Sequence, residues 1–113
     1  MCIRDRIVVE GRADVINLLR YGYTNVIALG GAKEKVPKTI LELAKNKKVI
    51  LFVDGDRGGE MIMRTVLSQM HVDYVARAPK GMEVEQLTGK EIARALAQMV
   101  PCLLYTSPSP RDS

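Results

Sequence analysis

Short runs of apolar residues alternate along this chain with stretches in which apolar residues recur at helical spacing. Residues 7–10 form a β-branched run and residues 25–29 a second apolar run, and both predict strands. The run at residues 49–53 is apolar at every position, which is typical of a strand buried on both faces, here residues 48–54. Residues 73–76 predict a further strand, so four short strands are expected.

The stretches between and after these strands predict helices, because their apolar residues fall on one face at intervals of three or four positions. Pro37 suits the first turn of one helix, and Gly58 and Gly59 open another. Residues 83–87 predict a short helical turn, and residues 90–100 predict a last amphipathic helix. The residues that mark the first three helices are Val15, Leu18 and Leu19; Ile40, Leu41 and Ala44; and Met61, Ile62, Thr65, Val66 and Met70 on one broad face. In the last helix Ile92, Leu96 and Met99 are expected to face inward.

Strands that alternate with helices of this length predict an α/β fold. Parallel strands need crossover connections, so we expect a mostly parallel four-stranded sheet with helices on both faces, joined by right-handed crossovers. No internal repeat or linker divides residues 7–100, which are therefore expected to form one domain.

The two ends of the chain carry a different signal. Residues 101–113 hold three of the five prolines and no helical or strand period, which predicts disorder. Residues 1–5 can be encoded by ATGTGTATAAGAGAC. Extended by AG, this DNA has the reverse complement CTGTCTCTTATACACAT, which encodes residues 102–106 in one frame. We therefore expect residues 1 to about 6 and about 101 to 113 to be non-native, translated from a sequencing adapter.

Composition favours a soluble globular protein, since 47% of the 113 residues are hydrophobic and 27% are charged. Its apolar runs are far shorter than the roughly 20 residues of a membrane helix, so we expect a cytoplasmic protein without a membrane partner. The net charge of +4 permits an anionic partner. Cys2 and Cys102 suggest neither a disulfide framework nor a cysteine-based metal site.

Acidic residues stand where the predicted strands end. Glu10 follows the first strand, and Asp54 and Asp56 follow the third, with Gly55 between them to allow a sharp turn. Ligands of open parallel sheets bind beyond the carboxyl ends of the strands, so these three carboxylates converge if the first and third strands are neighbours. Close carboxylates repel one another without a cation, and their oxygens suit Mg²⁺. The pattern predicts a Mg²⁺ site, which Mn²⁺ could also occupy.

Each of these signals also has a plainer interpretation. Glu10 alone could merely end a strand, and Asp14 could either support the metal ligands or interact with the helix dipole. Four basic residues fall in strand-end loops on the same predicted rim, where they would suit a phosphate backbone or form ordinary surface charge. These candidate nucleotide- or phosphate-binding residues are Arg12, Lys33, Arg57 and Lys80.

In combination, these residues resemble the TOPRIM domain: Glu10, Gly11 and Asp14 follow the first strand, and the Val-Asp-Gly-Asp of residues 53–56 ends the third. An ordered set of segments is similar to the archaeal DnaG-type primases and spans residues 7–100. These segments are Val-Glu-Gly-Arg-Ala-Asp at 9–14, Gly-Ala-Lys at 31–33 before Val-Pro-Lys at 36–38, Asp-Gly-Asp-Arg-Gly-Gly-Glu at 54–60, and Glu-Val-Glu-Gln-Leu-Thr at 83–88 with Lys-Glu-Ile at 90–92.

The resemblance implies a primase, a DNA-directed RNA polymerase and nucleotidyltransferase that joins ribonucleotides into an RNA primer on a single-stranded DNA template. It implies Glu10, Asp54 and Asp56 as catalytic, metal-binding acids, with Glu10 also suited to act as general base. It further implies that these archaeal proteins associate with exosome subunits and favour adenine-rich RNA. Their flanking regions are missing here, so the isolated chain is expected to bind metal weakly and to synthesise little or nothing.

Other functions could use the same acids. A TOPRIM nuclease or topoisomerase would cleave phosphodiester bonds, and a topoisomerase would also need a nucleophilic tyrosine, for which Tyr21, Tyr23 and Tyr74 have no supporting context. An RNA-binding exosome subunit would keep the acids without depending on turnover. A phospho-acceptor receiver domain is disfavoured, because Glu10 stands alone where a pair of acids would be expected.

Overall fold

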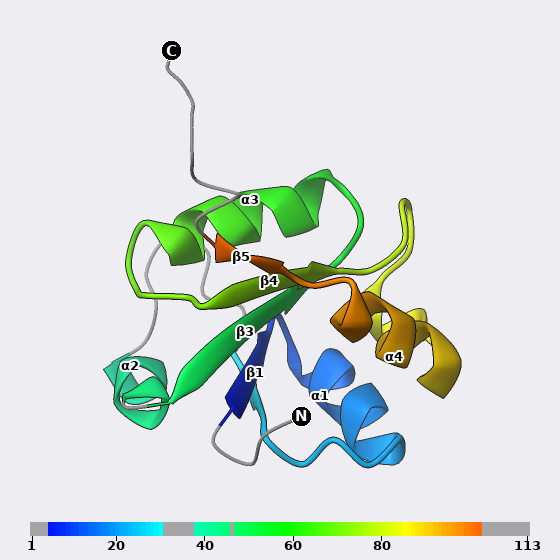
Figure 1. Cartoon of the computed structure of the whole chain (residues 1–113), viewed down its shortest axis with the longest axis horizontal. Coiled ribbons are helices and arrows are strands. Elements are labelled where there is room, and N and C mark those ends of the chain that lie inside the picture. Colours follow the sequence, from blue (N-terminus) through cyan, green and yellow to red (C-terminus); the bar gives the residue numbers. More distant parts are fainter. Residues whose placement is uncertain (1–4, 31–37, 46, 103–113) are drawn as a thin grey trace.

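The fold is arranged around β3 (Lys48–Val53), in which every residue after Lys48 is buried. The computed structural model describes residues 5–30, 38–45 and 47–102 (Figure 1). The other strands are β1 (Asp5–Val9), β2 (Val26–Ala28), β4 (Tyr74–Arg77) and β5 (Val100–Pro101). Their order in the sheet is β2-β1-β3-β4-β5, so β3 is the central strand.

The first four strands pair in parallel and β5 pairs antiparallel with β4, which confirms the predicted mostly parallel α/β fold. The connecting helices are α1 (Arg12–Arg20), α2 (Lys38–Ala44), α3 (Arg57–Leu67), the 3₁₀ turn η1 (Val84–Gln86) and α4 (Gly89–Ala97). Among the described helices, none combines the length and the apolar character needed to cross a membrane.

The number of strands differs from the prediction: the described residues form five strands and not four. β1 begins at Asp5, two residues before the predicted run, and β5 falls where a helix was expected to continue to residue 100. Two residues are too few to show a strand period, and the second of them is Pro101, which a sheet accepts only at an edge. β5 occupies such an edge.

Alternate residues of the central strands face two separate cores. On β3, Ile50 and Phe52 pack with the α1, η1 and α4 side, whereas Leu51 and Val53 pack with the α2 and α3 side. Figure 1 shows α3 on one face of the sheet and α1 with α4 on the other. Full burial of one such side chain contributes roughly 1.5–3 kcal/mol, so both layers stabilise the position of β3 and of the turn that follows it.

The start of α3 lies unusually close to the end of β3. The Asp56 carboxylate caps the helix by accepting a hydrogen bond from the Gly59 N–H at 2.8 Å. A Cβ atom on Gly59 would lie 2.2 Å from the Asp54 carbonyl oxygen, whereas one on Gly58 would meet only the Asp56 Oδ1 at 3.4 Å. The first contact is impossible and the second is ordinary, so only one of these neighbouring glycines is required by packing.

We predict that Gly59→Ala lowers the free energy of unfolding by about 2–3 kcal/mol, because the added methyl group forces α3 away from β3. Urea denaturation followed by circular dichroism measures this change. The matched control is Gly58→Ala, which should leave stability unchanged or raise it by up to about 1 kcal/mol through the lower entropy of the unfolded chain. Equal effects of the two substitutions would contradict the close contact.

Candidate metal centre

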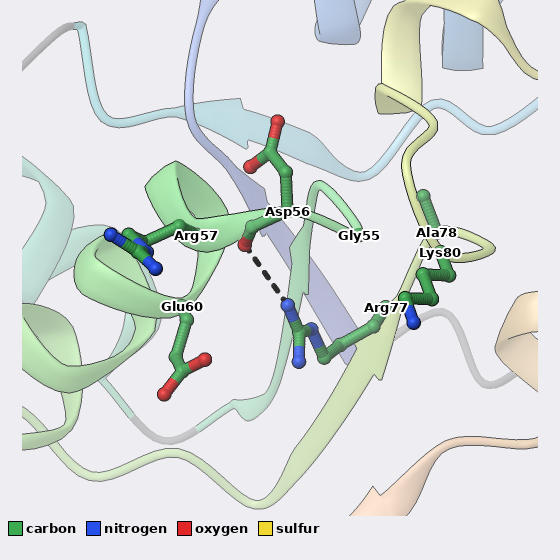
Figure 2. A pocket seen from close by; sticks show the side chains of 7 residues that line it. All are labelled: Gly55, Asp56, Arg57, Glu60, Arg77, Ala78 and Lys80. Atoms are coloured by element: carbon green, nitrogen blue, oxygen red, sulfur yellow. Dashed lines mark hydrogen bonds between the residues drawn. The ribbon is translucent and has the colours of Figure 1, made fainter.

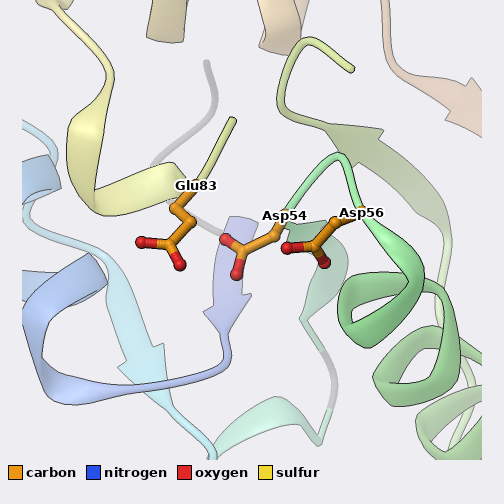
Figure 3. Close-up of side chains that lie close together, drawn as sticks. All are labelled: Asp54, Asp56 and Glu83. Atoms are coloured by element: carbon orange, nitrogen blue, oxygen red, sulfur yellow. The ribbon is translucent and has the colours of Figure 1, made fainter. Parts of the chain in front are cut away.

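Three carboxylates from two segments of the chain meet beyond the carboxyl end of β3 (Figure 3). Asp54 and Asp56 lie in the turn between β3 and α3, and Glu83 directly precedes η1. One carboxylate oxygen from each lies within 4.8 Å of the other two. Two oxygens on opposite sides of one Mg²⁺ are about 4.2 Å apart, so small side-chain rotations would let all three reach a single ion. An all-oxygen donor set suits a hard divalent cation.

Glu83 was not among the metal ligands predicted from the sequence. It belongs to the segment 83–88 that is similar to the archaeal primases, but no function was predicted for it. The signal that could have identified it is its position, because it follows the fourth predicted strand and therefore belongs to the same edge of the sheet as Asp54 and Asp56.

Glu10 borders this trio. It follows β1, which pairs with β3, so the expected neighbourhood of the first and third strands is confirmed. Partial burial raises the pKa of Glu10, and the charges of Asp54, Asp14 and Asp56 raise it further. Among the described residues, however, the group of three carboxylates that all lie within 4.8 Å of one another consists of Asp54, Asp56 and Glu83, and Glu10 is not a member of it.

Negative charge in the cluster is only partly neutralised by its surroundings. The Asp54 Oδ1 accepts a hydrogen bond from the Val84 N–H at 2.8 Å. This bond lowers the pKa of Asp54, but burial outweighs it and the charges of Asp56 and Glu85 add to the rise. The pKa of Glu83 is also raised, first of all by Glu85. A bound divalent cation would relieve the repulsion that these shifts express.

Asp14 approaches the cluster from α1 without joining the trio. Only 6% of its surface is exposed, and its carboxylate accepts a hydrogen bond from the Gly11 N–H at 3.2 Å. Burial foremost, with a contribution from the charge of Asp54, raises the pKa of Asp14 to about 6 against the opposing effect of the Gly11 hydrogen bond. Asp14 therefore closes the first turn of α1, and its charge is coupled to that of Asp54.

The turn that carries the aspartates is attached to the segment after β4 through backbone contacts. The Gly55 N–H donates to the Met82 carbonyl, and the Gly81 N–H donates to the Gly55 carbonyl, both at 2.9 Å. A Cβ atom on Gly55 would lie 2.2 Å from the Pro79 carbonyl oxygen, so the two backbones are in direct contact. Only glycine permits this approach.

Arg77 adds a side-chain contact to the same turn. Its Nη2 donates to the Asp56 carbonyl at 3.1 Å, with the Asp54 carbonyl at 3.5 Å (Figure 2). Its Nε is buried with no hydrogen-bond partner among the described residues. The guanidinium group therefore braces the turn through carbonyl oxygens and does not neutralise a carboxylate there.

A cleft of about 500 Å³ lies beside this turn. It is lined by Gly55, Asp56, Arg57, Glu60, Arg77, Ala78 and Lys80 (Figure 2). Arg57 and Lys80 are two of the four basic residues expected on this rim. Arg77 was not among the predicted phosphate-binding residues, because it belongs to no motif. Glu60 forms an ion pair with Arg64 at 2.8 Å, which leaves the cleft with an excess of cationic groups.

The remaining two basic candidates lie elsewhere. Arg12 is exposed at the first residue of α1 and does not line this cleft. Lys33 lies outside the described residues. The structure thus brings together two of the four expected cations at the cleft and adds Arg77.

Sequence comparisons identify similar proteins over most of the chain. The Toprim domain family matches residues 5–87. The DNA primase DnaG of Aeropyrum pernix is 77% identical over 95 residues, which are 84% of this chain and 23% of that protein. The DNA primase DnaG of Thermofilum pendens is 68% identical over 95 residues, 84% of this chain and 22% of the relative. The chain thus spans about a quarter of the length of the curated relatives it matches.

Solved structures of primases share the fold. A DNA primase domain from Pseudomonas aeruginosa superposes with a TM-score of 0.68 at 27% identity, over 89% of this chain and 35% of that one. The RNA polymerase domain of Mycobacterium tuberculosis primase DnaG gives a TM-score of 0.72 at 20% identity, over 90% of this chain and 38% of that one. That domain has also been solved in complex with a double-stranded DNA oligomer carrying a 6-nucleotide overhang.

The raised pKa of Asp14 predicts how stability depends on pH. An unfolded aspartate titrates near about 3.9, so between that pH and the folded value of about 6 the folded chain binds more protons. The stability contributed by protonated Asp14 is therefore fully present below about pH 4 and is lost as the pH rises through about 6. Asp14→Asn, which keeps an oxygen for the Gly11 N–H, should make this fall shallower.

Urea denaturation in buffers between about pH 4 and pH 7 measures the effect. The control is Glu42→Gln on α2, which removes one exposed carboxylate away from the cluster and should preserve the slope. A slope that is the same in Asp14→Asn and in the unsubstituted chain would contradict the assignment.

Proposed function

The chain belongs to the Toprim domain family, and we propose that it forms the Mg²⁺-dependent catalytic core of a DNA primase that joins ribonucleotides into an RNA primer on single-stranded DNA. The observation that carries this proposal is the meeting of Asp54, Asp56 and Glu83 within 4.8 Å beside Glu10. The names of the archaeal relatives support primer synthesis as the reaction. Because the chain covers about a quarter of those proteins, the rest of the template and nucleotide site lies in other parts of such a polymerase.

In this proposal Asp54, Asp56 and Glu83 hold the divalent ion, and Glu10 lies at its border. When bound, Mg²⁺ supplies charge neutralisation for the reacting phosphates and polarises an attacking hydroxyl group. Glu10 would act as general base for a hydroxyl group, since partial burial and the neighbouring carboxylates raise its pKa and so make it a stronger base. Asp14 supports the arrangement by closing the first turn of the helix that follows Glu10.

The cationic side chains would bind phosphate groups. Arg57 and Lys80 line the cleft beside Asp56, so a nucleotide phosphate held there would also border the metal ligands. Arg12, exposed at the start of α1, would contact the nucleic-acid backbone from the side of Glu10. Single-stranded template, primer and ribonucleotides all carry the phosphate groups that these contacts require.

Phosphodiester cleavage of the topoisomerase type receives no support from the described tyrosines. Tyr74 begins β4, and Tyr21 and Tyr23 follow the carboxyl end of α1. Parallel strands and their antiparallel crossover helices place all three at the edge of the sheet opposite the acidic cluster. Association with an exosome and preference for adenine-rich RNA have no counterpart in the names of these relatives and stay predictions.

We predict that Asp56→Asn reduces primer synthesis at least about 100-fold, a loss of ~2.7 kcal/mol of transition-state stabilisation, because one metal ligand becomes neutral. The measurement uses the Aeropyrum pernix relative with this chain grafted in place of the similar segment, single-stranded template and Mg²⁺. Glu42→Gln is the control, since it removes an exposed carboxylate on α2. Wild-type synthesis by the Asp56→Asn graft would refute the metal assignment.

A second prediction concerns nucleic-acid binding by the same graft. Lys80→Gln should make the slope of log affinity against log salt concentration shallower by about 0.7, the value for one lost phosphate contact on a single strand. Fluorescence anisotropy with a labelled single-stranded oligonucleotide measures the slope. The matched control is Lys45→Gln, which removes an exposed lysine after α2 and should leave the slope unaltered. Equal slopes for all variants would remove Lys80 from the binding surface.

A further inference from the structure

Asn17 is a polar residue on α1, yet only 3% of its surface is exposed. It is not one of the carboxylates of the acidic cluster. Its side-chain amide donates two hydrogen bonds, to the carbonyls of Val84 and Leu87, each at 2.9 Å. An amide nitrogen has two protons, and both are used on carbonyls that bracket η1. A buried amide with both donors satisfied fixes the orientation of the turn that it contacts.

The turn held by Asn17 is the one that presents Glu83 to the cluster. Glu83 is the residue directly before η1, and its N–H is itself bound by the Gln86 side chain at 3.2 Å. The Val84 carbonyl accepts a hydrogen bond from Asn17, and the Val84 N–H donates one to the Asp54 Oδ1 at 2.8 Å. One residue therefore transmits the position of Asn17 to two acids, Glu83 through the chain and Asp54 through a hydrogen bond.

The same helix begins just after Glu10, so Asn17 also relates that acid to the other segments. α1 starts at Arg12 and packs against η1. Three separate stretches of chain supply the acids: the end of β1, the turn after β3 and the residue before η1. Asn17 lies on the helix that follows the first stretch and is hydrogen-bonded to the third, and the third is hydrogen-bonded to the second through Val84 and Asp54.

We propose that Asn17 is a positioning residue for the metal centre: its two hydrogen bonds set the place of Glu83 and Asp54 and so determine how tightly the divalent ion binds. This inference rests on the proposed function, because it presupposes that the acidic cluster binds a metal. Asn17 itself contacts no ligand. Loss of its amide would leave the Val84 and Leu87 carbonyls without that donor, and η1 would relax away from the cluster.

The test is a Mn²⁺ titration of the 113-residue chain, with free Mn²⁺ followed by electron paramagnetic resonance. Asn17→Leu keeps the branched shape of the side chain and removes the donors, and it should weaken Mn²⁺ binding about 10-fold, which corresponds to ~1.4 kcal/mol. Arg20→Ala is the local control: the Arg20 side chain donates to the Asn17 Oδ1 at 3.4 Å and not through the Asn17 amide nitrogen, so its removal leaves both amide donors in place. Its Mn²⁺ affinity should match that of the unsubstituted chain.

A second control separates positioning from general loss of stability. Met63→Ala truncates a buried residue of α3 in the core on the opposite face of the sheet. It should lower the melting temperature without a comparable loss of Mn²⁺ affinity, and circular dichroism confirms that each variant is folded during titration. If Asn17→Leu does not fold, Asn17→Gln keeps the amide on a longer arm and should retain the fold with weaker Mn²⁺ binding.

A double-mutant cycle tests whether Asn17 acts through Glu83. In a Glu83→Gln background, Asn17→Leu should cost much less Mn²⁺ affinity than it does alone, because the ligand that it positions is already lost. Affinity in Asn17→Leu equal to that of the unsubstituted chain, or a loss no larger than in Met63→Ala, would overturn this inference alone. Absence of Mn²⁺ binding by the unsubstituted chain would overturn the metal centre and this inference together.

Discussion

Mutual repulsion among carboxylates is the constraint around which this fold is organised. Asp54, Asp56 and Glu83 lie within 4.8 Å of one another, and burial and neighbouring charge raise the pKa of Asp54 and Glu83. The contacts that hold them together are mainly backbone hydrogen bonds, including the two made by Gly55 to the segment after β4. Those bonds join backbone groups to one another, so the backbone itself holds the three carboxylates close together.

This arrangement explains why the surrounding cations do not cancel the acidic charge. The Arg77 guanidinium group donates to carbonyl oxygens of the turn, and Glu60 forms an ion pair with Arg64. A direct ion pair between a nearby arginine and Asp54 or Asp56 would lower the attraction of the cluster for a metal. The acids and the cationic cleft thus remain separate neighbours, which is the charge distribution that a metal–phosphate complex requires.

The sequence predicted those features that depend on local pattern. The apolar runs located β3 and its neighbours, and the placement of acids after strands predicted that Glu10, Asp54 and Asp56 lie at one edge of the sheet, since parallel strands end at one edge. The position of Glu83 after the fourth strand indicates the same edge of the sheet, but its close approach to Asp54 depends on how residues 78–82 fold back onto Gly55. That contact is tertiary, and no periodicity in the chain records it.

Short or isolated features were missed for a related reason. β5 consists of two residues and pairs only with β4, so it has no period to detect. The two polar residues buried on α1 carry a more general lesson. Asp14 and Asn17 interrupt the apolar face of a short helix, and each costs stability that an apolar residue would have supplied. Asn17 is hydrogen-bonded to Val84, and the charge of Asp14 is coupled to that of Asp54. These two positions of α1 therefore contribute less to core packing and more to the position of the acidic cluster, as expected of a preorganised site.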